Sequence, residues 1–150
     1  VKYGLAGFNG AGRRFEFKGK YNGADVYDDY AHHPGELQAL LDAVEPLGYK
    51  RTILVFQPHT YTRTAALFED FVEQLKRPDV AYLAEIYAAR ETNTCGISSA
   101  DLARRIPGSL FLDSFEEIES SLRATARPGD IILTVGAGDV YKIGEDLVRE

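Results

Sequence analysis

Sulfur-containing residues are almost missing from the sequence, which has one cysteine, Cys95, and no methionine. A disulfide framework needs paired cysteines and a cysteine-rich zinc site needs several, so the sequence excludes both. We expect Cys95 to be a reduced thiol without a structural role. The chain begins at Val1, and the missing methionine indicates a piece of a longer polypeptide or a processed chain.

Long hydrophobic runs and an excess of basic residues are missing too. The longest apolar runs hold about six residues, whereas a membrane-spanning helix needs roughly 20, and no basic-then-apolar leader is recognisable. Lysine and arginine number 17 against 23 aspartates and glutamates, which gives a net charge of -6. Binding to nucleic acid needs a net basic face. We therefore expect neither a membrane nor a nucleic acid as a partner, and a cytoplasmic location.

The residues that are present are typical of one globular domain. The 150 residues, of which 45% are hydrophobic, are enough to bury a sizeable core. No low-complexity run and no internal repeat interrupts them. We expect residues 1–150 to form a single domain.

The N-terminal part predicts a β-hairpin followed by a helix. Residues 13–21, RRFEFKGKY, alternate polar and apolar side chains, and residues 24–29, ADVYDD, are typical of a second strand. Between them, Tyr-Asn-Gly at 21–23 predicts a tight turn. Pro34 suits the first position of a helix, and the hydrophobic residues after it recur at helical spacing until Gly48.

Further along the chain, strand-like and helix-like segments alternate. TILVF and DIILTV are continuous apolar runs, typical of strands buried on both faces of a sheet. Strands that alternate with helices imply right-handed crossovers and a mainly parallel sheet. We expect a Rossmann-like α/β fold of about six strands, with one antiparallel strand from the hairpin and helices on both faces. The expected strands here are residues 52–56, 79–86, 109–113 and 130–135, and the expected helices are residues 34–47, 64–76, 98–106, 115–126 and 136–150.

Polar residues gather where four of the predicted strands end. DYAHHP (29–34), QPHTYTR (57–63), EIYAARE (85–91) and GAGD (136–139) each follow a strand. In open α/β sheets, ligands bind beyond the carboxyl ends of the strands. All three histidines of the chain belong to these four segments. We therefore expect the binding site there, and we call these four segments the rim.

A metal site and a hydrolase site are the weaker interpretations of the rim. His32, His59 and Asp29 could act as three zinc ligands, but the spacing matches no zinc signature. His32 and its neighbour His33 also point to opposite faces of an extended segment. The serines start helices or strands away from the rim, where capping explains them better than a nucleophilic dyad does. We expect no metal ligands in this chain.

GAGDVY at 136–141 begins like a dinucleotide-binding fingerprint, but Tyr141 replaces the third glycine. A structural strand-to-helix turn and a weak anion site with free backbone N–H groups are both open interpretations. The sequence has no G-x-x-x-x-G-K-[ST] motif, so we expect no triphosphate cradle in this chain.

Three residues favour nucleotide contacts. Arg14, the second of a basic pair, is either a solvated surface residue or a phosphate ligand that uses its planar fork of donors. Asp28 and Asp29 end a strand on opposite faces, so only one of them faces the rim, where it could accept from ribose hydroxyls. Tyr30 beside them could cover an adenine ring.

Together, DDYAHHP (28–34), QPHTYTR (57–63), RRFE (13–16) and VGAGD (135–139) resemble the C-terminal domain of the Mur ligases, and the similarity runs essentially from end to end. DYAH-type segments occur across this family, whereas DDYAHHP with QPH-x-YTR points to its alanine-adding branch. The muropeptide-recycling branch usually has Phe at the position of Tyr30 and lacks the GAGD ending. That branch and a stand-alone Rossmann-like nucleotide-binding module are the alternatives.

The resemblance implies a three-domain bacterial enzyme of peptidoglycan synthesis, of which this chain is the C-terminal domain. An N-terminal domain would hold the UDP-sugar, and a central P-loop domain would hold ATP and Mg²⁺. ATP would phosphorylate the lactyl carboxylate of UDP-N-acetylmuramate, and the amine of L-alanine would attack the acyl phosphate. The C-terminal domain would close this site, and it would be inactive alone.

The resemblance also implies roles for single residues. Arg14 would contact the ATP phosphates, Asp29 the ribose hydroxyls and Tyr30 the nucleotide. The residues that would meet the amino acid and the transferring phosphate are His32, His59 and Arg63. A guanidinium such as that of Arg63 suits the carboxylate of L-alanine, because a charge-assisted hydrogen bond joins them.

Three positions depart from the family pattern. Thr60 stands where the family usually has Arg, so one carboxylate or phosphate contact of the family is either absent here or comes from Arg63 alone. Gly35 stands where Thr is usual, which loosens the start of the helix. Arg90 replaces a residue that is often small.

Overall fold

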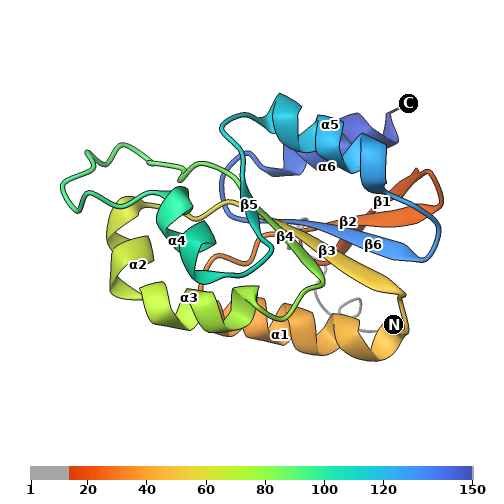
Figure 1. Cartoon of the computed structure of the whole chain (residues 1–150), viewed down its shortest axis with the longest axis horizontal. Coiled ribbons are helices and arrows are strands. Elements are labelled where there is room, and N and C mark those ends of the chain that lie inside the picture. The colour runs from red at the N-terminus through yellow and green to blue at the C-terminus, as the bar shows by residue number, and fades with distance from the viewer. Residues whose placement is uncertain (1–13, 150) are drawn as a thin grey trace.

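A computed structural model of the chain describes residues 14–149, and Arg13, the first residue of the predicted hairpin, lies outside them. The strands are β1 (Glu16–Tyr21), β2 (Ala24–Asp29), β3 (Arg51–Phe56), β4 (Val80–Leu83), β5 (Leu110–Phe111) and β6 (Asp130–Val135). They form one sheet in the order β1-β2-β6-β3-β4-β5 (Figure 1). β1 and β2 are antiparallel, and every other neighbouring pair is parallel. This confirms the predicted Rossmann-like sheet.

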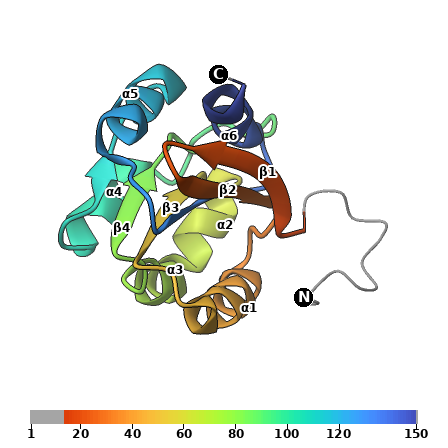
Figure 2. The ribbon, with the colours of Figure 1, turned by 90° about the vertical axis from the view of Figure 1, so that its right-hand side faces the viewer.

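Helices cover both faces of the sheet, as predicted. The helices are α1 (Pro34–Val44), η1 (Glu45–Leu47, a 3₁₀ helix), α2 (Tyr61–Ala66), α3 (Phe68–Leu75), α4 (Ser99–Arg105), α5 (Phe115–Thr125) and α6 (Tyr141–Val148). α1, α3 and α4 pack on one face, and α5 and α6 pack on the other (Figures 1 and 2).

Strand β3 shows why a short apolar run identifies a central strand. Leu54 and Phe56 belong to the core under α1, α3 and α4, whereas Ile53 and Val55 belong to the core under α5 and α6. Successive side chains of a strand point to opposite faces, so a strand covered on both faces must be apolar throughout. The neighbouring strand β6 is buried at every position.

The hairpin turn confirms the Tyr-Asn-Gly signal. Asn22 and Gly23 have φ angles of 51° and 83°, and Tyr21 pairs with Ala24 across them. Two consecutive positive φ angles match the twist of an antiparallel pair, and Asn-Gly accepts them at low cost. A Cβ on Gly23 would lie 2.7 Å from Pro128, so the turn also packs too closely for a side chain.

The predicted helix 64–76 is wrong as a single element, because it is two helices. α2 begins at Tyr61, and α3 begins at Phe68 after a break at Leu67, which has φ −111° and ψ 23°. Leu67, at the break, and Phe68, after it, are partly buried and pack against the core. The apolar pattern thus continues across the break, and for this reason periodicity did not reveal it.

Four other predicted elements are shorter in the structure. The strands predicted at 79–86 and 109–113 keep only the residues of β4 and β5. The helix predicted from Pro34 to Leu47 starts as predicted but stays α-helical only to Val44; its last turn is the 3₁₀ helix η1, which Gly48 ends at φ 84°. The helix predicted at 136–150 begins only at Tyr141, because 136–139 form a turn.

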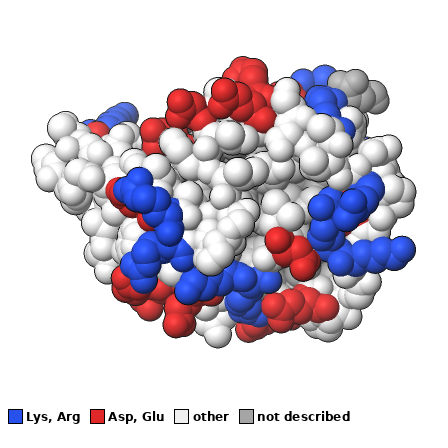
Figure 3. Space-filling view, viewed as in Figure 1, with Lys and Arg blue, Asp and Glu red and all other residues white. Residues whose placement is uncertain are grey.

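Charged side chains of both signs share the face of the molecule in Figure 3, and the upper edge, over α5, is acidic. Two arginines form ion pairs: Arg77 with Asp42 and Glu45, and Arg105 with Glu69. Such pairing neutralises the positive charge that nucleic-acid phosphates would need. Among the described residues, no helix combines the length and apolarity needed to cross a bilayer.

Candidate functional site

The carboxyl ends of four neighbouring strands lie level at the rim. Asp29 of β2 and Phe56 of β3 are both register partners of Val135 of β6, and Phe56 is also the partner of Leu83 of β4. The four rim segments therefore leave the sheet at the same height. This is the edge where open α/β sheets bind ligands.

Three aromatic side chains predicted or implied for the site come together at this edge. The His32 ring lies 5.8 Å from the His59 ring and 5.3 Å from the Tyr30 ring, measured between centroids, with edge-type geometry in both cases. His59 stacks on Tyr87 at 5.5 Å and an interplanar angle of 12°. Tyr30 and Tyr87 remain 44% and 39% exposed, so both side chains are partly accessible from solvent.

Arg63 completes this cluster from helix α2. Its Nη1 lies 3.3 Å from Nδ1 of His59. A guanidinium can only donate, so Nδ1 accepts and the imidazole is neutral, with its proton on Nε2. Burial lowers the pKa of His59, and the positive charges of Arg63 and His32 act in the same direction.

His32 has the opposite tautomer. Its Nδ1 lies 3.1 Å from the Tyr30 carbonyl oxygen and 3.5 Å from a carboxylate oxygen of Glu36. Both partners only accept, so Nδ1 holds a proton, and Nε2 has the lone pair whenever the ring is neutral. With both rings neutral, the pair presents one acceptor, at His32, and one donor, at His59.

The two aspartates of DDYAHHP are both buried, and they serve different partners. Asp28 accepts a hydrogen bond from the Thr134 hydroxyl at 2.8 Å. Asp29 is 4% exposed and accepts from the backbone N–H groups of Phe15 at 2.8 Å and Ala31 at 2.9 Å. One lone pair on each Asp29 oxygen is therefore already used inside the domain.

The charge of Arg14 acts on the carboxyl group of Asp29. Burial raises the pKa of the Asp29 carboxyl, although the hydrogen bonds from Ala31 and Phe15 and the charge of Arg14 act in the opposite direction. The exposed Arg14 side chain is thus close enough for its charge to reach Asp29. Asp29 and Tyr30 are adjacent, so all three residues predicted to contact the nucleotide lie at one end of the rim.

His33 belongs to the helix start rather than to the cluster's chemistry. It is the N-cap of α1, and the Glu36 carboxylate accepts from the N–H groups of His32 at 3.0 Å and His33 at 3.3 Å. A glutamate three residues after the cap satisfies N–H groups that the helix leaves unpaired. The predicted start of the helix at Pro34 is confirmed, and His33 is its cap.

Comparisons with known proteins decide the family. The family model described as Mur ligase, glutamate ligase domain, matches residues 13–138. The chain belongs to this family. A UDP-N-acetylmuramate–L-alanine ligase from Lachnospira eligens is 50% identical over 153 residues, covering 99% of this chain and 33% of the relative. The chain therefore spans about a third of the length of the curated relatives it matches.

Solved structures agree on the fold of this Mur ligase domain. A UDP-N-acetylmuramate-alanine ligase from Thermotoga maritima has a TM-score of 0.68 and 23% identity, covering 91% of this chain and 29% of that one. The MurF ligase from Thermotoga maritima in complex with ADP has a TM-score of 0.64 and 19% identity, covering 91% and 31%.

The turn GAGD of this Mur ligase domain is structural at two of its amides. The N–H of Gly136 donates to the Asp29 carbonyl at 3.1 Å, and the N–H of Asp139 donates to Oε1 of Gln57 at 3.1 Å. Gln57 donates in return to the Asp139 carboxylate at 3.1 Å. For these two donors the interpretation as a structural turn holds, since neighbouring loops use them.

Sequence reasoning missed three residues of the rim: Tyr87, Glu91 and Asp139. Tyr87 stacks on His59, Glu91 accepts hydrogen bonds from helix α2, and Asp139 pairs with Gln57. Tyr87 and Glu91 stand in EIYAARE, a segment that already indicated the rim by following a strand. No local pattern predicts the partners of Tyr87 and Glu91, because these partners lie about 30 residues away along the chain.

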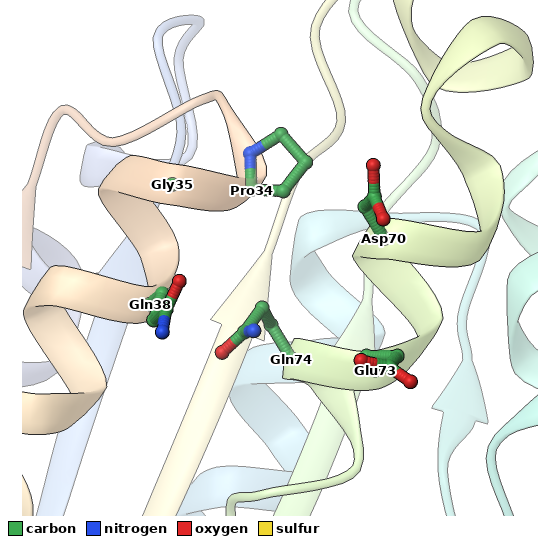
Figure 4. Close-up of a pocket in the computed structure, with 6 residues that line it drawn as sticks. All are labelled: Pro34, Gly35, Gln38, Asp70, Glu73 and Gln74. Carbon is green, nitrogen blue, oxygen red and sulfur yellow. The ribbon is translucent and has the colours of Figure 1, made fainter.

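A polar hollow of about 390 Å³ lies apart from the histidine cluster, between α1 and α3. Figure 4 shows Gln38 on α1 opposite Gln74 on α3, with Asp70 and Glu73 along α3. None of the predicted site residues lines it. Within residues 14–149, no three His, Cys, Asp or Glu side chains are grouped to hold a metal ion.

Proposed function

We propose that the chain is the C-terminal domain of a cytoplasmic, three-domain bacterial ligase that uses ATP to join L-alanine to UDP-N-acetylmuramate in peptidoglycan synthesis. The observation that carries this is 50% identity to a UDP-N-acetylmuramate–L-alanine ligase over 99% of the chain. The chain spans a third of that relative. The sites for the UDP-sugar and for most of the ATP then belong to the other domains.

The nucleotide end of the rim suits the edge of an ATP site. Arg14 would meet the phosphates through its planar fork, and the exposed Tyr30 ring would cover the adenine. Asp29 has lone pairs beyond the two that Phe15 and Ala31 use, and these would accept from ribose hydroxyls. The MurF ligase of similar fold was solved with ADP. The Mg²⁺ that accompanies ATP would take its ligands mainly from the central domain.

The histidine end of the rim suits the amino acid and the transferring phosphate. Arg63 gives one N–H to His59 and has further donors for the carboxylate of L-alanine. The amine must lose a proton before it attacks the acyl phosphate, and Nε2 of His32 has the lone pair to accept one. Nε2–H of His59 and the Arg63 charge would stabilise the oxygens of the tetrahedral intermediate. Domain closure would exclude water from them.

A chimaeric enzyme tests this proposal. Residues 1–150 would replace the matching third of the Lachnospira eligens relative, and phosphate release would be measured with ATP and UDP-N-acetylmuramate, with and without L-alanine. We expect L-alanine-dependent release. A folded chimaera with no such activity contradicts the proposal, provided that the parent relative is active in the same assay.

The same chimaera separates the alternatives. If it accepts a peptide in preference to L-alanine, the chain comes from a muropeptide-recycling ligase. The 150-residue chain alone should not hydrolyse ATP, and it should bind ATP with a dissociation constant in the millimolar range or weaker, about −4 kcal/mol at 1 mM. Micromolar ATP binding by the chain alone would instead favour a stand-alone nucleotide-binding module.

A further inference from the structure

The segment between His59 and Arg63 has an unusual backbone. Thr60 has φ 69° and ψ 147°, and helix α2 begins at the next residue. A β-branched residue with positive φ is rare, because its side chain crowds the backbone. Such a conformation persists only when surrounding contacts over-determine it. The neighbours of this turn therefore decide where His59 and Arg63 lie.

A large part of this support comes from the side chain of Glu91. One carboxylate oxygen accepts from the N–H groups of Tyr61 at 2.7 Å and Thr62 at 3.1 Å. The other accepts from the Thr62 hydroxyl at 2.5 Å. The first N–H groups of a helix have no partner within the helix, so an external acceptor fixes the position of the whole first turn.

The backbone before Glu91 holds this side chain next to helix α2. After β4 the chain runs beside the turn, where Tyr87 N–H donates to the Pro58 carbonyl at 2.9 Å and Thr60 N–H donates to the Tyr87 carbonyl at 2.8 Å. Ala89 and Arg90 then both have positive φ angles, 50° and 77°. This left-handed pair reverses the chain and places Glu91 against α2.

We propose that Glu91 is a positioning residue that fixes the first turn of α2 and thereby holds the His59–Arg63 pair in place. Tyr61 and Thr62 lie between the two members of the pair, so clamping them sets the 3.3 Å separation of the guanidinium and the imidazole. We call the hydrogen bonds from Tyr61 and Thr62 to Glu91 the clamp. The clamp does not depend on the proposed function, whereas its consequence for L-alanine binding rests on that function.

The Glu91 carboxylate also acts on His59 through its charge. Hydrogen bonds from Thr62 hold the pKa of Glu91 below the ordinary glutamate value, so the group is ionised at neutral pH. The charged groups that act on His59 are Arg63, His32 and Glu91, and only Glu91 favours the protonated imidazole. Tyr87, which stacks on the ring, is not among these charged groups. Removing the charge of Glu91 should therefore lower the pKa of His59 further.

NMR on the 150-residue chain tests the clamp with Glu91→Gln. We expect the His59 titration midpoint to fall and the amides of Tyr61 and Thr62 to exchange several-fold faster with deuterium. Glu91→Asp, which keeps the charge, should keep more of the parent midpoint. Glu117→Gln is the matched control, because it removes an exposed glutamate charge from the first turn of another helix, α5. It should leave the His59 midpoint and the exchange rates of the Tyr61 and Thr62 amides unchanged.

An unchanged His59 midpoint together with unchanged exchange in Glu91→Gln overturns the proposal, even if the chimaera is an active ligase. In an active chimaera, Glu91→Gln should raise the KM for L-alanine more than the KM for ATP. If the NMR shifts occur and the chimaera has no alanine-dependent activity, the clamp stands and the proposed function fails.

Discussion

Burial and three charged neighbours act on the protonation of His59. Burial lowers its pKa below the ordinary 6.5, and Arg63 and His32 act in the same direction. The folded chain therefore binds fewer protons here than the unfolded chain at pH values just below 6.5. Stability is lost as the pH falls through 6.5 toward the lower folded value.

We expect the His59 ring to titrate below pH 6.5 in an NMR titration of the 150-residue chain. His59→Gln should reduce the loss of stability between pH 7 and pH 5, because glutamine has no proton to bind. Denaturant unfolding at the two pH values measures this. A midpoint at or above 6.5 would show that Glu91 outweighs burial and the two cations.

Arg63 and Asp29 should affect different substrates in the chimaeric enzyme. Arg63→Ala removes the proposed donor for the alanine carboxylate, so we expect a larger rise in the KM for L-alanine than in the KM for ATP. Asp29→Ala should have the reverse effect, through the ribose. Steady-state kinetics with each substrate varied in turn gives both values. Equal effects of both variants on both substrates would contradict the division of the rim.

At the scale of elements, the start of helix α2 combines a favourable cap with an unfavourable backbone. The Thr60 hydroxyl accepts from the N–H of Arg63 at 3.3 Å, and the Thr64 hydroxyl donates to the Thr60 carbonyl at 2.7 Å. The positive φ of Thr60 costs roughly 1–3 kcal/mol. A cap of this kind is worth about 1 kcal/mol relative to alanine, and only a few tenths relative to glycine.

These magnitudes predict opposite signs for two substitutions at Thr60. Thr60→Gly relieves the strained φ and loses little of the cap, so it should stabilise the chain by about 1 kcal/mol. Thr60→Ala loses the cap and keeps a Cβ at positive φ, so it should destabilise the chain by about 1 kcal/mol. Urea unfolding of both variants beside the parent checks this. Shifts of the same sign in both would mean that cap and strain are not separable here.

At the scale of the whole molecule, a pair of carboxyl groups joins the two helices on one face of the sheet. Burial raises the pKa of Glu119 on α5 to about 7, helped by its hydrogen bond to Asp146 on α6. The same hydrogen bond lowers the pKa of Asp146. Glu119 thus holds the shared proton. Because its folded pKa lies above the unfolded 4.5, its contribution to stability is complete below 4.5 and disappears as the pH rises through about 7.

Glu119→Gln should mimic the protonated state at every pH. We expect it to melt at the parent's temperature at pH 5 and above it at pH 8. Thermal unfolding followed by circular dichroism measures both, and Glu117→Gln, an exposed neighbour, is the control. A variant that is no more stable than its parent at pH 8 would mean that the two carboxyl groups do not share a proton.

The hydrophobic pattern predicted the molecule's architecture because it is set by local rules. Ile53 to Phe56 had to be apolar in a strand covered on both faces, and Asn22-Gly23 had to be a tight turn. The rim could be placed for the same reason, since strand ends follow from strand positions. The hydrogen bonds between rim segments could not be predicted. The bond from helix α2 to Glu91, for example, depends on a left-handed turn at Ala89 and Arg90, where no glycine indicates a positive φ.

The absence of a side chain at Gly138 has a consequence for protein engineering. A Cβ there would lie 2.6 Å from both Oε1 of Gln57 and the Tyr87 ring, so three rim segments fill one space. Each segment is shaped by the other two. A loop graft that moved only one of them into a related ligase would introduce a mismatch, so residues 57–63, 85–91 and 136–139 should be transplanted as one cassette.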